Sequence, residues 1–267
     1  MNKAWFFGCS FTSGVGYNFE EYLDPESDSF KPNLDLNNES VWESSQYLSW
    51  CKEWKTKYQY DIWPYLVSRK LGVECVNKGE GGSGNLRILH KIIRNLKNFK
   101  KGDLVFIGFT HPTRILIPTN LKHPKISTLL LEPSTLGKST GKKDDTRLIG
   151  GYTKLSEDQQ HILIDYLYYI VHEFSDHIEE YDFTTISELV KFLTKIGVKP
   201  FLWDYSHWSY YENIFIHTHG TVKDGHWSIN GHREFSNTVL NALGKNESIL
   251  PPREIVNRHF KVRKNII

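Results

Sequence analysis

The chain of 267 residues has little cysteine and no long hydrophobic run. Its three cysteines, Cys9, Cys51 and Cys75, are odd in number and are not spaced like metal ligands, so we expect no metal site and a reducing compartment. The first ten residues hold one Lys and an apolar run too short for a signal peptide, and no later run approaches a membrane span. These absences predict a cytoplasmic protein without a membrane partner; a phage-encoded protein made in a host cytoplasm would show the same pattern.

The chain also lacks an excess of charge of either sign. It has 33 basic and 31 acidic side chains, a net charge of +2, which gives no electrostatic reason to expect a nucleic-acid partner. Hydrophobic residues make up 39%, enough for the core of one large globular domain. Aromatic residues make up 14%; most large aromatics lie in cores, but exposed ones can stack on sugars.

Short apolar runs alternate with segments of helical periodicity. This order predicts an α/β fold, a doubly wound parallel sheet with helices on both faces, in a single domain spanning residues 1–267. The predicted strands are residues 4–7, 73–77, 104–109, 200–203 and 214–216, and the predicted helices are 60–71 (capped by Asp61), 86–96, 162–174, 185–196 and 230–243. Residues 17–54 and 111–152 read as long irregular insertions, either walls of a site or solvated loops.

The first strand is followed by Gly8, Cys9 and Ser10 and then by small turn-forming residues. Ligands bind at the carboxyl ends of the strands of α/β sheets, so Ser10 is a candidate nucleophile. The alternative is an ordinary turn residue or helix cap.

A serine nucleophile needs a general base, usually a histidine that a carboxylate orients. Asp224 and His226 lie two residues apart around Gly225, on what reads as a loop. They are the candidate acid and base, and the alternative is a surface turn with no role. His232 is a second candidate base, but its place at the start of the last helix favours packing or capping.

Two further segments follow predicted strands. In the glycine-rich run 77–85, backbone N–H groups such as that of Gly82 can stabilise an oxyanion, although the glycines can equally form only a tight connection. The run does not have the spacing of a phosphate-binding loop. Asn85 can donate its amide or cap the next helix, and capping is favoured. Thr110 and His111 can aim donors at the same point or simply end their strand.

In the order of these segments, the chain resembles the SGNH (GDSL-like) hydrolases, a flavodoxin-like group of serine esterases and carbohydrate acetyl-esterases. Gly8-Cys9-Ser10 looks like the family's Gly-Asp-Ser block, and Gly82 looks like its second-block glycine. The sequence Asp224-Gly225-His226-Trp227 is similar to the form found in relatives that acetylate alginate and other polysaccharides. The resemblance implies Ser10 as nucleophile, His226 as base, Asp224 as acid, and the N–H groups of Ser10 and Gly82 as oxyanion donors.

The chain departs from the family pattern at two positions. Cys9 replaces the Asp of the first block, and Thr110 stands where the family has an oxyanion-binding Asn. Loss of such a donor costs roughly a hundred- to a thousand-fold in turnover unless another group replaces it. The Thr110 hydroxyl or the Asn85 amide are the candidates.

The resemblance therefore implies a serine esterase that hydrolyses a small ester, such as an O-acetyl group on a carbohydrate, through an acyl-enzyme and without a metal or cofactor. Asn85, His111 and Trp227 are weaker candidates for contacts with the substrate. Two alternatives remain: an O-acyltransferase that uses the same Ser-His-Asp site, and an inactive glycan-binding or structural module of the same fold. Nothing in the sequence indicates the oligomeric state.

Overall fold

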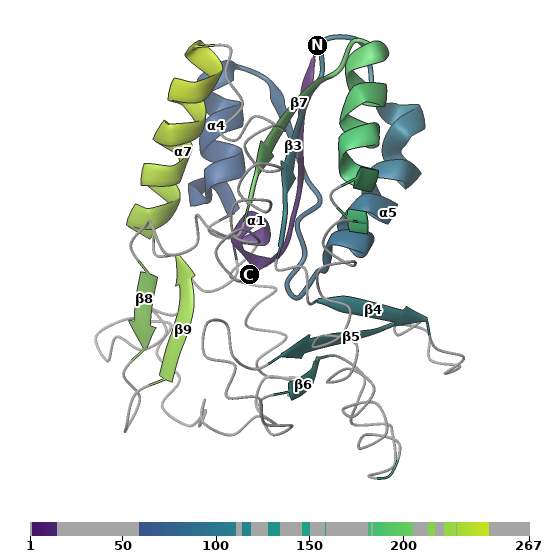
Figure 1. Ribbon diagram of the computed structural model, residues 1–267. Helices are drawn as coiled ribbons and strands as arrows, with labels where there is room; N and C mark the ends of the chain where they lie inside the picture. Colours follow the sequence, from purple (N-terminus) through teal and green to yellow (C-terminus); the bar gives the residue numbers. More distant parts are fainter. Residues whose placement is uncertain are drawn as a thin grey trace, which may run out of the picture.

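The centre of the protein is a four-stranded parallel sheet (Figure 1). The computed structural model describes residues 2–14, 59–110, 114–118, 128–133, 146–149, 158, 181–182, 184–204, 213–216, 222–227 and 229–245. The sheet has the strand order β2-β1-β3-β7 and is formed by β1 (Lys3–Phe7), β2 (Glu74–Asn77), β3 (Leu104–Gly108) and β7 (Lys199–Trp203).

The strand order defines a switch point between β1 and β3. The chain leaves β1 to form β2 on one side, and then crosses back to form β3 on the other side of β1. This is the order of flavodoxin-like sheets, in which ligands bind beyond the carboxyl ends of the first and third strands. The α/β class and the parallel sheet are thus confirmed, and Ser10 and Thr110 both lie at the switch point.

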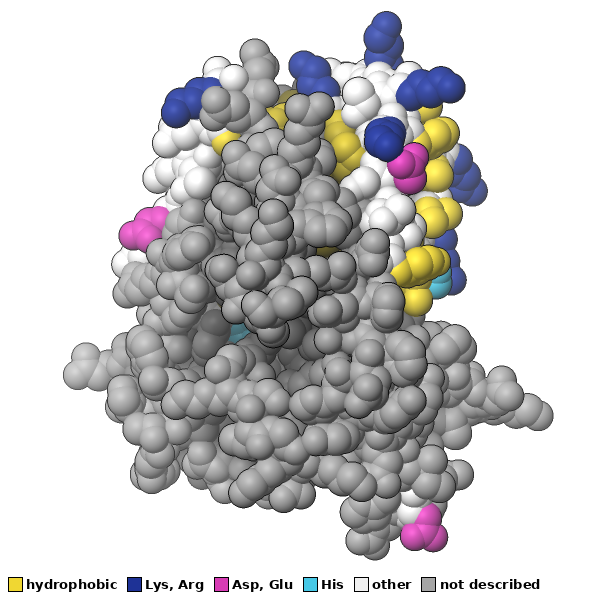
Figure 2. Space-filling view, viewed as in Figure 1, with side chains coloured by type: hydrophobic (Ala, Val, Ile, Leu, Met, Phe, Trp, Pro, Cys, Tyr) yellow, Lys and Arg dark blue, Asp and Glu magenta, His cyan; other side chains and the backbone are white. Residues whose placement is uncertain are grey.

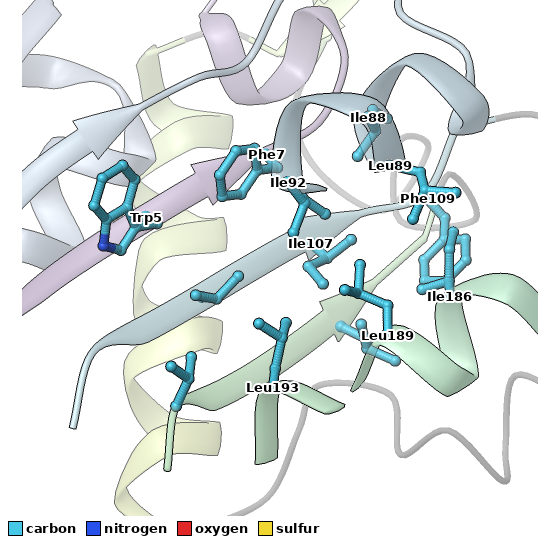
Figure 3. Packing of buried hydrophobic residues seen from close by; sticks show 13 residues of the cluster. Trp5, Phe7, Ile88, Leu89, Ile92, Ile107, Phe109, Ile186, Leu189 and Leu193 are labelled. Atoms are coloured by element: carbon cyan, nitrogen blue, oxygen red, sulfur yellow. The ribbon is translucent and has the colours of Figure 1, made fainter. Parts of the chain in front are cut away.

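Helices cover both faces of the sheet, because the strand residues alternate between two apolar faces. Trp5 and Phe7 point to one face, where they pack with α5 (Asn85–Asn95) and with the helix over residues 184–195 (Figure 3). Ala4 and Phe6 point to the other face, towards α4 (Trp63–Leu71) and α7 (Ile229–Gly244). The two helix pairs stand on opposite sides of the sheet in Figure 1.

A buried carboxylate fixes the amino edge of the sheet. Asp103 accepts hydrogen bonds from the Lys3 N–H at 2.9 Å, the Trp5 indole at 3.0 Å and the Lys100 N–H at 3.0 Å. The exposed Lys100 and Lys101 lie in the turn before β3, and the exposed Lys199 is the first residue of β7. Figure 2 shows Lys and Arg side chains gathered at this upper end of the molecule. The switch point is at the opposite edge, so this positive charge does not belong to the candidate site.

Three predictions of local structure are wrong. Asp61 does not cap the helix: it lies in the short 3₁₀ helix Gln59–Asp61, and α4 has Ile62 as its N-cap. Residues 224–227 are not a loop, because they end the strand β9 (Val222–Trp227), which pairs antiparallel with β8 (Asn213–Ile216). The insertion 111–152 is not irregular throughout, since it contains the strands of a second sheet.

This second sheet is antiparallel, with the order β4-β5-β6. Its strands are β4 (Ile115–Pro118), β5 (Thr128–Pro133) and β6 (Thr146–Ile149). Pro118 is the last residue of the edge strand β4, where proline is tolerated, and Pro133 is the last residue of β5. Both this sheet and the β8–β9 hairpin lie at the end of the molecule where α1 (Ser10–Ser13) is found (Figure 1).

The remaining elements agree with the sequence in type and differ by a few residues at their ends. The predicted helix 162–174 and the insertion 17–54 lie outside the described residues. Within the part of the chain that the structure describes, no helix is long and apolar enough to cross a membrane.

Candidate active site

Ser10 is the first residue of a single helical turn, α1, and two residues separate this turn from the end of β1. Cys9, in extended conformation, precedes the turn, and its carbonyl accepts the N–H groups of Thr12 and Ser13, both at 3.1 Å. The turn ends at Gly14, whose φ of 78° requires glycine. This sharp change of direction places the Ser10 side chain at the carboxyl edge of the sheet with only 5% of its surface exposed.

The turn around Ser10 is packed too closely for larger residues. A Cβ at Gly8 would lie 2.1 Å from Thr12 Oγ1, and one at Gly79 would lie 2.6 Å from the Ser13 nitrogen. Two hydrogen bonds hold the glycine-rich segment in place: Asn77 Nδ2 donates to the Thr12 carbonyl at 2.9 Å, and the Glu80 N–H donates to the Gly8 carbonyl at 3.1 Å. The segment that follows β2 is therefore fixed against the Ser10 turn.

Gly82 lies in a tight turn of this segment. The Ser83 N–H donates to the Glu80 carbonyl at 3.2 Å, and Gly82 has a φ of 70°, as the third residue of a type II turn requires. Glu80 also pairs with Arg87 and Lys91 of α5, which ties the turn to that helix. The Gly82 N–H makes no hydrogen bond to another described residue, so it remains available as a donor.

His226 lies directly against Ser10. Its Nε2 is 2.7 Å from Ser10 Oγ, although the two residues are 216 positions apart in the sequence. The imidazole also packs against Phe11, with ring centroids 5.0 Å apart. When Nε2 accepts the serine proton, the other ring nitrogen must carry the imidazole hydrogen. The structure thus brings the predicted nucleophile and base together in the geometry that proton transfer needs.

Trp227 anchors the strand that carries His226. It is fully buried (0% exposed), and its ring centroid is 4.9 Å from that of Phe11, 5.7 Å from that of Trp203 and 4.7 Å from that of Phe235. The expectation that Trp227 contacts the substrate is wrong, because no part of its surface is accessible. The end of β9 is held by this tryptophan in the core.

Two acidic residues lie in segments near the histidine. Asp224 is in β9, two residues before His226, and its side chain lies outside the description. Asp204 directly follows β7, with 6% of its surface exposed. Asp204 was not predicted as a candidate, although it follows a predicted strand directly, as the predicted site residues do.

His232 packs in the core, as its place in the first turns of α7 predicts. It is buried and stands edge-on to Trp227 at 5.6 Å. Burial, and secondly the charge of His226, lower the pKa of His232 to about 3. At neutral pH it is therefore uncharged, which fits a packing role and leaves His226 as the candidate base.

Asn85 and Thr110 are joined by two hydrogen bonds. The Thr110 N–H donates to Asn85 Oδ1 at 2.9 Å, and Asn85 Nδ2 donates to the Thr110 carbonyl at 3.1 Å. The capping role expected for Asn85 is wrong, because Gly84 is the N-cap of α5 and the Asn85 amide is used elsewhere. Asn85 Nδ2 also donates to Asp182 Oδ2 at 3.0 Å, so both amide hydrogens are in use and Asn85 has no free donor for a substrate. His111 lies outside the described residues.

The Cys9 thiol lies close to the hydroxyls of Ser10 and Thr110. Burial raises the pKa of the Cys9 thiol, and the nearby Arg114 charge and the Ser10 and Thr110 hydroxyls oppose this only in part. The thiol therefore stays protonated. Arg114 was not predicted as a neighbour of Cys9, because it lies in a segment without periodicity.

The arrangement combines a hydrogen-bonded Ser-His pair with backbone donors at a topological switch point. Among the described residues, no group of three His, Cys, Asp or Glu side chains is placed to hold a metal ion. Comparison of the chain with protein-family models, with curated proteins and with solved structures gave no match.

Proposed function

We propose that the protein is a serine esterase of the SGNH type that hydrolyses a small ester through an acyl-enzyme. The observation that carries the proposal is the 2.7 Å contact between His226 Nε2 and Ser10 Oγ at the switch point of a parallel sheet. A serine hydroxyl is a weak nucleophile at neutral pH, and a histidine within hydrogen-bond distance is what activates it. An acetyl ester on a carbohydrate is the substrate that the family resemblance favours.

In the first half of the reaction, His226 Nε2 takes the proton of Ser10 as Oγ bonds to the ester carbonyl carbon. The carbonyl oxygen becomes an oxyanion. The N–H groups of Ser10 and Gly82 and the Thr110 hydroxyl are the proposed donors to it. Support for this role is that the N–H groups of Ser10 and Gly82 make no hydrogen bond to another described residue.

The tetrahedral intermediate then collapses. The bond between the carbonyl carbon and the alcohol oxygen breaks, and protonated His226 gives its proton to the departing alcohol. In the second half, His226 takes a proton from water, the resulting hydroxyl attacks the acyl-Ser10 carbonyl, and the acid is released as Ser10 recovers its proton. Asp224 is the proposed partner of His226 that holds the imidazole in the required tautomer.

Labelling with a fluorophosphonate probe, together with hydrolysis of p-nitrophenyl acetate, tests the proposal. The parent protein should label and turn over substrate, Ser10→Ala should do neither, and His226→Ala should label far more slowly. His90→Ala is the matched control, because His90 is an exposed histidine of α5. Circular dichroism establishes that each variant is folded. A folded parent protein that neither labels nor hydrolyses the ester would refute the esterase and favour the inactive binding module.

The acceptor of the acyl group is tested on an acetylated oligosaccharide. Hydrolysis releases free acetate in the absence of any other acceptor. If acetate appears only as a new ester on an added glycan, the same Ser-His pair serves an acyltransferase instead.

A further inference from the structure

The side chain of Asn85 connects three segments that are far apart in the sequence. Its Oδ1 accepts the Thr110 N–H at 2.9 Å, and its Nδ2 donates to the Thr110 carbonyl at 3.1 Å and to Asp182 Oδ2 at 3.0 Å. One amide thereby joins the start of α5 to the residue after β3 and to the segment 181–182. Asn85 and Thr110 are 4% and 1% exposed, so these bonds are shielded from water.

The pairing fixes the main chain of Thr110 in a specific way. An asparagine amide that bonds both the N–H and the carbonyl of one residue replaces the neighbour that a β-strand would provide. On its other side the chain is held one residue earlier, where the Phe109 N–H donates to the Trp203 carbonyl at 2.8 Å. The chain direction at Thr110 is thus determined from both sides, just past the end of β3.

Asp182 determines which way the amide faces. A carboxylate accepts hydrogen bonds and repels a carbonyl oxygen, so it selects the orientation in which Nδ2 points towards it. In that orientation Oδ1 is left for the Thr110 N–H. The reversed amide would place its NH₂ group against the Thr110 N–H, donor against donor.

These hydrogen bonds of Asn85 fix the residue that carries the Thr110 hydroxyl. It is buried next to the Cys9 thiol, and it makes no hydrogen bond of normal geometry with a described residue. A buried hydroxyl without a partner destabilises the folded protein, so its retention needs a reason. We propose that Asn85 is a positioning residue that holds Thr110 so that this hydroxyl donates to the oxyanion formed at Ser10. The inference rests on the proposed esterase activity and assigns the oxyanion donor of that same site.

A double-mutant cycle on kcat tests the inference. Thr110→Val removes the hydroxyl at nearly constant volume and should lower kcat on p-nitrophenyl acetate about 100-fold. Asn85→Ala keeps the Thr110 hydroxyl but removes the side chain that holds it in position. This variant should lower kcat about 10- to 100-fold with little change in KM. Because both changes act on one donor, the double variant should be no slower than Thr110→Val alone, whereas independent effects would multiply. Thr110→Ser, which keeps a hydroxyl, should retain most of the parent kcat.

Asn95→Ala is the matched control on the same helix. Asn95 Nδ2 donates to the Lys91 carbonyl at 2.7 Å at the far end of α5, so its loss should affect stability but not kcat. If Asn85→Ala does not fold, Asn85→Ser takes its place in the cycle. The positioning role would be overturned if the losses of kcat in the two single variants multiplied in the double variant, or if a folded Asn85 variant kept the parent kcat. The esterase proposal would stand in both cases. A parent protein without turnover overturns both, and the labelling experiment identifies that case separately.

Discussion

Replacing Trp227 with phenylalanine should slow the reaction more than its effect on stability explains. Trp227 follows His226 directly in β9 and packs among Phe11, Trp203 and Phe235. A phenylalanine leaves part of this space empty, and the surrounding rings and the end of the strand move to fill it. His226 moves with the strand, so its Nε2 no longer lies 2.7 Å from Ser10 Oγ.

The expected loss of stability is small for a folded domain, whereas the expected loss of kcat is large. Loss of part of a buried tryptophan destabilises a core by roughly 1–3 kcal/mol. A folded domain tolerates such a loss, since a typical free energy of unfolding is about 5–15 kcal/mol. A displacement of a catalytic group by about 1 Å costs about 100-fold in rate, so we expect kcat to fall about 10- to 100-fold.

Trp5→Phe is the comparison that separates the two effects. Trp5 is also buried, but it packs on the other face of the sheet, and its indole bonds Asp103 at the edge away from Ser10. Urea unfolding should show a similar loss of stability in both variants, whereas p-nitrophenyl acetate kinetics should show a loss of kcat only in Trp227→Phe. Equal kcat in the two variants would refute the idea that Trp227 positions the base.

Two further predictions concern the acid and the pH range. Asp224→Asn should lower kcat by about 10³- to 10⁴-fold with the fold intact, as loss of the tautomer-holding carboxylate does, and a larger loss in Asp204→Asn than in Asp224→Asn would move that role to Asp204. Because the pKa of His232 is about 3 in the folded protein and near 6.5 when unfolded, the unfolded state binds the extra proton below pH 6.5. The free energy of unfolding should then fall by about 1 kcal/mol between pH 6 and pH 5. The free energy of unfolding of His232→Leu, measured by urea titration, should not show this fall. An equal fall in that variant would contradict the lowered pKa of His232 as its cause.

The central sheet was predictable because its strands have a simple pattern. The runs around Trp5 and Phe106 are continuously apolar, as expected of parallel strands covered on both faces. Gly72 and Gly197 have a positive φ just after two helices, in agreement with the predicted helix ends at residues 71 and 196. No single segment of the sequence indicates the order of the strands within the sheet, so that order is known only from the structure.

The strands β4, β5, β6 and β9 were missed for local reasons. Proline and polar residues dominate the segments around the second sheet, and they obscure the short apolar strands between them. In β9, Gly225 favours a turn over a strand on propensity alone. Pairing with β8 overrides that preference, and no pattern within six residues can reveal a partner elsewhere in the chain.

For the candidate site, the sequence indicated the residue types and their order. The contact of Ser10 with His226 was expected from that order and is present in the structure. The bonds of Asn85 could not be foreseen, because a cap and a bridge to Thr110 call for the same residue at the same helix start. The roles of Gly82 and Thr110 towards an oxyanion stay predictions.

The separation of Ser10 and His226 has a consequence during synthesis of the protein. The ribosome makes the proposed base, His226, 216 residues after the proposed nucleophile, Ser10. At typical translation rates of about 5–20 residues per second, that interval is roughly 10–40 s. Throughout it the nascent chain carries a serine without its base, so it cannot turn over an ester by this route. The Ser-His pair forms only when the later segment places Trp227 among the aromatic rings of the earlier one, and the proposed activity would then report that these two segments have come together.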